Sequence, residues 1–113
     1  MNNLLADYVA AAREHGQYSS SGQSDMANNA HERLQDTLLA LIAEGRDSEL
    51  LTLYDNPDAW VQLWAGTHTL ELDEGKAIAK LESLKAARKP LVSMSAKYTL
   101  VAWQEGNLSF RNK

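Results

Sequence analysis

Three histidines, His15, His31 and His68, are the side chains of this sequence that titrate nearest to neutral pH, and so they are the first candidates for acid–base chemistry. None of them stands in the H-E-x-x-H spacing or another metal-ligand spacing. Glu71 follows His68 three residues later, a spacing that allows either an acid/base pair or an ordinary polar contact on one face of a helix. We expect His15 near a helix C-terminus, where a cation is favoured, and His31 in solvent.

The other signatures of catalysis are missing from the sequence. The serines at 19–21 have no Gly-x-Ser-x-Gly turn around them, and the six glycines form neither a phosphate loop nor a dinucleotide fingerprint. Without cysteine there is no thiolate zinc site, disulfide or cysteine nucleophile. The paired carboxylates Asp55/Asp58 and Asp73/Glu74 precede apolar runs, where helix capping explains them. We therefore expect no enzyme, no cofactor and no metal.

Charge is distributed unevenly along the 113 residues, although the net charge is only −4. Residues 1–74 hold 13 acidic and three basic side chains, whereas residues 75–113 hold two acidic and eight basic ones. Such a split predicts a dipolar surface that can steer a charged partner. The alternative is that the fold mixes the two sets and leaves an ordinary surface.

The apolar spacing is helical in the first half of the chain. A line that begins at Leu4 is expected to stop at Gly16, and residues 19–24 form a connecting loop. A second helix of about 18–20 residues, capped by Ser24 or Asp25, is expected to end at Gly45. Asp47 can then cap a short leucine-rich helix.

The second half predicts three more helices. Asn56 suits an N-cap, with Pro57 at the first helical position and Asp58 in the first turn. Asp73 and Glu74 begin the next helix, and Pro90 begins the last, which is expected to end near Gly106. For the last helix we expect one apolar line to face the core: Leu91, Met94, Tyr98, Val101 and Ala102.

These elements predict an all-α fold in a single domain of five or six antiparallel helices, with residues 106–113 as a flexible or extended tail. No apolar run approaches the roughly 18 residues that span a bilayer, and the first residues lack the basic and apolar regions of a signal peptide. We therefore expect a cytoplasmic protein that does not contact a membrane.

The segment from Leu50 to Leu84 resembles a HEAT-type repeat. A short leucine helix is followed by an Asp-Asn-Pro turn, by a helix with Val61 and Ala65 at the spacing such repeats use, and by a second amphipathic helix. The chain as a whole is similar to a small bacterial family of HEAT-like helical domains of undefined function. It also resembles, in size, charge and helix layout, helical immunity proteins of contact-dependent growth inhibition systems. The resemblance implies an α-α superhelix.

These observations favour a protein-binding inhibitor. The resemblance implies an immunity protein whose partner is a cognate bacterial toxin, a basic nuclease, and whose acidic surface occupies the toxin's cationic cleft. An exposed tryptophan or tyrosine beside acids is a plausible anchor. The expected partner-binding residues are Tyr54, Asp55, Asp58, Trp60, Glu71, Asp73 and Glu74.

Two other functions remain open from the sequence. The lysines of residues 76–97, with Lys76 and Lys80 one helical turn apart, could follow the phosphates of a nucleic acid, although the acidic pI of about 5.3 opposes this. Alternatively, the chain is a structural or regulatory domain that forms a homodimer and has no charged partner.

Overall fold

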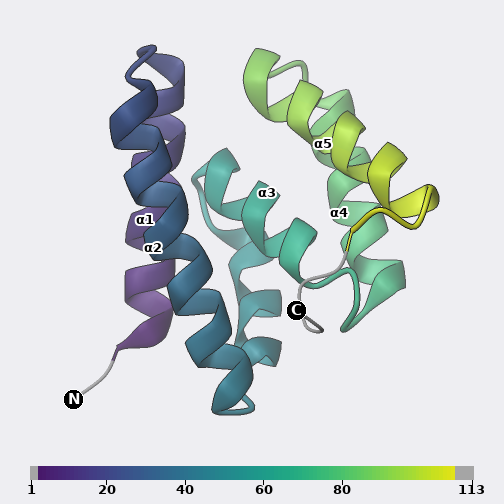
Figure 1. The fold of residues 1–113 in the computed structure, drawn as a ribbon. Coiled ribbons are helices and arrows are strands. Elements are labelled where there is room, and N and C mark those ends of the chain that lie inside the picture. The colour runs from purple at the N-terminus through teal and green to yellow at the C-terminus, as the bar shows by residue number, and fades with distance from the viewer. Residues whose placement is uncertain (1–2, 109–113) are drawn as a thin grey trace. The chain divides into compact units, whose positions relative to one another are not determined.

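In a computed structural model, residues 3–108 form six helices and no strand (Figure 1), which confirms the all-α prediction. The chain divides into two compact units, Met1–Glu49 and Leu50–Lys113. The single domain and the superhelix stay predictions. The helices are α1 (Leu4–Ser20), α2 (Ser24–Ala43), the 3-10 helix η1 (Asp47–Asp55), α3 (Ala59–His68), α4 (Glu74–Ala86) and α5 (Pro90–Gln104).

The first unit is a hairpin in which α1 and α2 lie side by side (Figure 1). The Asn3 side chain caps α1 by accepting a hydrogen bond from the Ala6 amide at 3.1 Å. The connecting loop is only three residues long. Its Gly22 has φ +76°, a backbone conformation that residues with a side chain rarely adopt. Leu34, Leu38 and Leu41 of α2, which follow one another at helical spacing, are buried.

The ends of these two helices correct the sequence prediction. α1 does not stop at Gly16 but continues to Ser20, with Gly16 buried inside it. Glycine costs a helix only about 0.5–1 kcal/mol, which packing of the surrounding turns offsets. α2 begins at Ser24, so Ser24 and Asp25 are inside the helix, and no side chain caps it. Its end is as predicted, with Gly45 at φ +69° just past the last turn.

In the second unit, the residue that caps α3 differs from the predicted one. The residue that caps α3 is Asp58, whose carboxylate accepts hydrogen bonds from the Trp60 and Val61 amides at 2.8 and 3.2 Å. Asn56, the predicted cap, instead accepts a bond from the Asp58 amide at 2.9 Å and so stabilises the turn before the helix. The prediction misplaced the cap because Asn-Pro and Asp are both strong signals for a helix start, and spacing alone does not rank them.

The remaining helices start as predicted. Asp73 caps α4 by accepting a bond from the Lys76 amide, and Pro90 is the first residue of α5. α3, α4 and α5 share a core of buried side chains, to which Trp60 and Trp103 add partly buried rings. A Cβ at Gly66 would lie 3.3 Å from Leu81 carbons, so the glycine allows α3 and α4 to approach closely. The buried residues are Leu63, Leu70, Ala77, Leu81, Leu84, Val92, Ala96 and Leu100.

The orientation of α5 overturns the predicted core line. Val92, Ala96 and Leu100 are the buried residues, whereas Leu91, Met94, Tyr98 and Val101 are exposed. Ala102, the fifth member of the predicted line, is partly buried. Beyond α5, Gly106 has φ +75° and Leu108 packs against the core. The rest of the predicted tail, residues 109–113, lies outside the described residues.

Candidate functional site

Four large apolar side chains lie exposed on one line of α5. Leu91, Met94, Tyr98 and Val101 are 37, 48, 61 and 42% exposed, and their positions are three, four and three residues apart. This spacing keeps them on the same face of a helix over about 15 Å. We call these four residues the outer stripe. Scattered exposed apolar residues are ordinary, but a contiguous line of them on one element is typical of a binding surface.

The surroundings of the outer stripe are basic along most of its length, whereas the exposed Glu105 follows Val101 by one turn at the C-terminal end. Between residues 83 and 104 the sequence has four basic side chains and no acidic one. The Lys97 ammonium lies 6.0 Å from the centre of the Tyr98 ring, a cation–π distance. Arg88 and Lys89 are exposed at the N-terminal end of the stripe, where the helix dipole is also positive. The outer stripe therefore combines apolar surface with a positive edge.

Two polar contacts tie α5 to α4 in the orientation that exposes the stripe, and a third closes the first turn of α5. The Trp103 indole N–H donates to a Glu74 carboxylate oxygen at 2.8 Å, which ties the C-terminal half of α5 to the start of α4. At the other end, the Ser93 hydroxyl donates to the Leu84 carbonyl at 2.7 Å and accepts from the Lys89 amide at 2.9 Å. Together with the buried line of α5, these contacts fix which face is presented.

Among the partner-binding residues expected from the sequence, Tyr54 contacts two side chains of the second unit. Its hydroxyl lies 2.6 Å from the Thr69 hydroxyl, and the Lys80 ammonium lies 5.9 Å from the centre of its ring. The pKa of the Tyr54 phenol is raised above its ordinary value. Burial is the largest cause, the bond to Thr69 opposes it, and the charge of Asp73 adds to it. The ring is partly buried, so it offers less surface than an exposed anchor would.

Most of the expected acidic residues have structural roles. Asp58 and Asp73 cap helices, and Glu74 accepts the Trp103 bond, whereas Asp55 and Glu71 are exposed. Asp58 precedes α3 and Asp73 follows it, so about 15 Å of helix separates the two caps. The other expected anchor, Trp60, is partly buried and packs against the core.

The lysines considered for nucleic-acid binding also have contacts within the unit. The Lys76 ammonium lies 3.9 Å from the Asp73 carboxylate, and Lys80 lies over Tyr54. The last part of the acidic segment, residues 50–74, therefore meets the basic segment in the second unit.

His68 belongs to the core. It is the last residue of α3 and is buried, with its ring stacked 5.3 Å from that of Trp64. Because α3 ends there, Glu71 lies in the turn that follows and not one helical turn further along the same face. The pair that the spacing allowed on one face of a helix is therefore not formed in that helical geometry.

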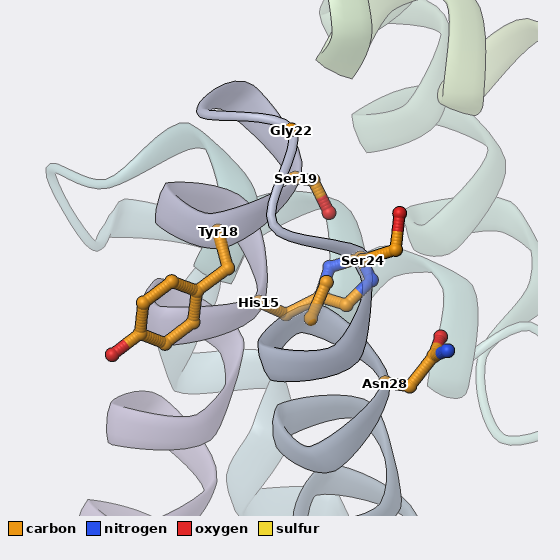
Figure 2. Close-up of a pocket in the computed structure, with 7 residues that line it drawn as sticks. His15, Tyr18, Ser19, Gly22, Ser24 and Asn28 are labelled. Carbon is orange, nitrogen blue, oxygen red and sulfur yellow. The ribbon is translucent and has the colours of Figure 1, made fainter.

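A pocket of about 290 Å³ lies where α1 passes into α2 (Figure 2). Figure 2 shows the His15 ring between the two helices near Ser24, while the Tyr18 ring points away from it. No signal in the sequence marks this pocket, since residues 19–24 have the composition of a connector, and two helix ends meet only in the fold. Its lining residues are His15, Tyr18, Ser19, Gly22, Ser24, Ala27 and Asn28.

The environment of His15 differs from the expected one. Because α1 continues past it to Ser20, His15 lies within the helix and not at the end where a cation is favoured. Burial, and next the charge of His31, lower the pKa of the His15 imidazole below its ordinary 6.5. The centres of the two rings are 5.8 Å apart, so His31 is not simply solvated. At neutral pH His15 is uncharged and can accept or donate a hydrogen bond.

Two kinds of site are absent from residues 3–108. No three side chains among His, Cys, Asp and Glu are grouped so that they could hold a metal ion. No helix in this range has the length and apolarity needed to cross a membrane.

Comparison with known proteins supports the class of the fold but no activity. The chain is an all-helical protein whose backbone is similar to a solved structure, that of the protein RPA1889 from Rhodopseudomonas palustris. The two superpose with a TM-score of 0.88 at 21% sequence identity, over 95% of this chain and 90% of the other. No family model matches the sequence, and no curated protein matches it either. At this identity the likeness describes the fold alone.

Proposed function

We propose that this chain is a protein-binding domain and that its docking surface is the outer stripe of α5. The observation that carries the proposal is the exposure of four large apolar side chains on one helical line. Surfaces of this kind bind protein partners because covering the apolar area is favourable by about 25 cal/mol per Å². Tyr98, the most exposed of the four, is a residue type enriched at binding hot spots.

The test compares proteins captured from the native host by three tagged chains. The first is the wild type, and the second carries Met94→Ser and Tyr98→Ser. The third carries Met26→Ser and Leu39→Ser, which removes two comparably exposed apolar residues of α2. We expect at least one protein to be captured in stoichiometric amount by the wild type and the α2 variant, and at least tenfold less by the stripe variant. The same captured set for all three chains would contradict the proposal.

A second candidate function is the toxin inhibitor that the sequence resemblance implies. What supports it is the exposure of Asp55 and Glu71, whose carboxylates can face a cationic surface. In this function the partner is a basic nuclease toxin, and charge reversal at Asp55 and Glu71 weakens its binding while the stripe variant does not. Unchanged affinity after reversal of these two charges would exclude the acidic-surface mechanism.

A further inference from the structure

The spacing of the outer stripe specifies the shape of what covers it. Leu91, Met94, Tyr98 and Val101 follow the three-four-three alternation of a coiled-coil seam, in which apolar side chains of one helix fit between those of another. A facing helix of about three turns would cover the whole stripe. A flat or extended partner would leave part of this narrow line in water.

The charge beside the stripe indicates the sign of the charge that the partner carries. Arg88, Lys89 and Lys97 are exposed, and none of them forms an ion pair with another residue of the described range 3–108. Lys85, by contrast, lies 3.6 Å from Glu82 and is partly compensated. A facing helix with carboxylates next to its apolar line would compensate the three remaining charges.

The same charges oppose pairing of α5 with a second copy of itself. An antiparallel pair centred between Met94 and Tyr98 would bring the two Lys97 ammonium groups together near the symmetry axis. A parallel pair would align Arg88 and Lys89 with their own counterparts. Like charges in these positions reduce affinity, so self-association through α5 is disfavoured.

We infer that the outer stripe binds an acidic amphipathic helix of a partner protein. The inference rests on the proposed function, because it names the partner of the same surface. The apolar line of the partner helix packs on Met94 and Tyr98, and its carboxylates face Lys97 at the side and Arg88 and Lys89 at the N-terminal end of α5.

Synthetic helical peptides test the inference directly. The probe is a labelled peptide of about three heptads with leucine at the two seam positions and glutamate beside them, and its matched control has lysine in place of glutamate. Fluorescence anisotropy measures binding of each peptide to the full chain at low and physiological salt. We expect the glutamate peptide to bind at least tenfold more tightly than the lysine peptide at low salt, with the difference shrinking as salt is added.

Two variants of the full chain complete the experiment. Met94→Ser with Tyr98→Ser should abolish binding of the glutamate peptide, and Lys97→Glu with Lys89→Glu should reverse the preference between the peptides. Equal binding of both peptides, tighter binding of the lysine peptide, or binding of neither would overturn the inference. If neither peptide binds while capture from the host still depends on the stripe, the proposed function stands and the acidic helix is wrong. A stripe-dependent dimer in sedimentation velocity at neutral pH would also overturn it, because a second copy would then cover the stripe.

Discussion

Tyr54 illustrates how one residue predicted as an anchor is used inside the fold. The Thr69 hydroxyl donates to the Ala65 carbonyl at 2.8 Å, so its oxygen is an acceptor and the Tyr54 hydroxyl is the donor of the 2.6 Å bond between them. We predict that Tyr54→Phe lowers the free energy of unfolding by about 1–2 kcal/mol, since a buried acceptor loses its donor. Urea denaturation measures the change. The control is Tyr98→Phe, whose exposed hydroxyl should contribute less than about 0.5 kcal/mol.

His15 gives the protein a stability that depends on pH. Its pKa in the folded chain lies below 6.5, so folding favours the neutral imidazole. This contribution is complete above the unfolded pKa near 6.5 and is lost as the pH falls through the folded pKa. We therefore predict that the urea midpoint of the wild type falls on acidification below about pH 6.5 and that His15→Gln reduces this slope. Equal slopes for the two proteins would contradict the assignment.

His31 provides an independent check on the same pair. Its charge is the second cause of the lowered His15 pKa, after burial. We predict that His31→Gln moves the His15 pKa part of the way back toward 6.5, as followed by NMR titration of the ring protons. No change would leave burial as the whole cause.

At the scale of elements, the start of α3 distinguishes Asp58 from Asp55. From the sequence alone, helix capping explained both carboxylates. Asp58 accepts two backbone bonds at the helix start, whereas Asp55 is exposed three residues earlier. We predict that Asp58→Ala costs about 0.5–2 kcal/mol of unfolding free energy, as loss of an N-cap does, and that the matched Asp55→Ala costs less than about 0.5 kcal/mol. Thermal or urea unfolding followed by circular dichroism compares them. Equal costs would mean that Asp58 does not act as the cap.

Local signals predicted some helix ends correctly, but they did not predict the face that α5 buries. Asp73, Pro90 and Gly45 act where the sequence placed them, because capping and a left-handed turn depend on a few adjacent residues. α5 could not be oriented in this way. It carries two apolar lines on opposite faces, one through Met94 and one through Ala96, and the contacts that choose between them come from α4. The candidate site was therefore visible as a pattern but was assigned to the core.

At the scale of the whole molecule, the boundary between the two units falls at residue 49 and not at residue 74, where the charge along the sequence changes sign. Residues 1–49 hold eight acidic and three basic side chains, whereas residues 50–113 hold seven acidic and eight basic ones. Only residues 50–74 of the acidic segment share the second unit with the basic segment that follows. Steering of a partner by the second unit then depends on local groups, such as the bases beside the outer stripe, and not on one large dipole.

The low net charge and the outer stripe together predict where the protein self-associates. Near the pI of about 5.3 the net repulsion between molecules is smallest, so exposed apolar surface is most able to cause nonspecific association. This association joins the stripe to other surfaces of neighbouring molecules, because the like charges of Arg88, Lys89 and Lys97 oppose pairing of two copies of α5. We predict that light scattering by the wild type is greatest near this pH and is reduced by Met94→Ser with Tyr98→Ser, which leaves the charge unchanged. Met26→Ser with Leu39→Ser should have a smaller effect, because these two residues do not form a continuous line with other exposed apolar side chains of α2. Circular dichroism at each pH must show that the chain remains folded, since loss of the His15 contribution begins in the same range. If both double variants scatter as the wild type does, association near the pI comes from charge neutralisation alone, and the stripe is not the most adhesive surface of the molecule.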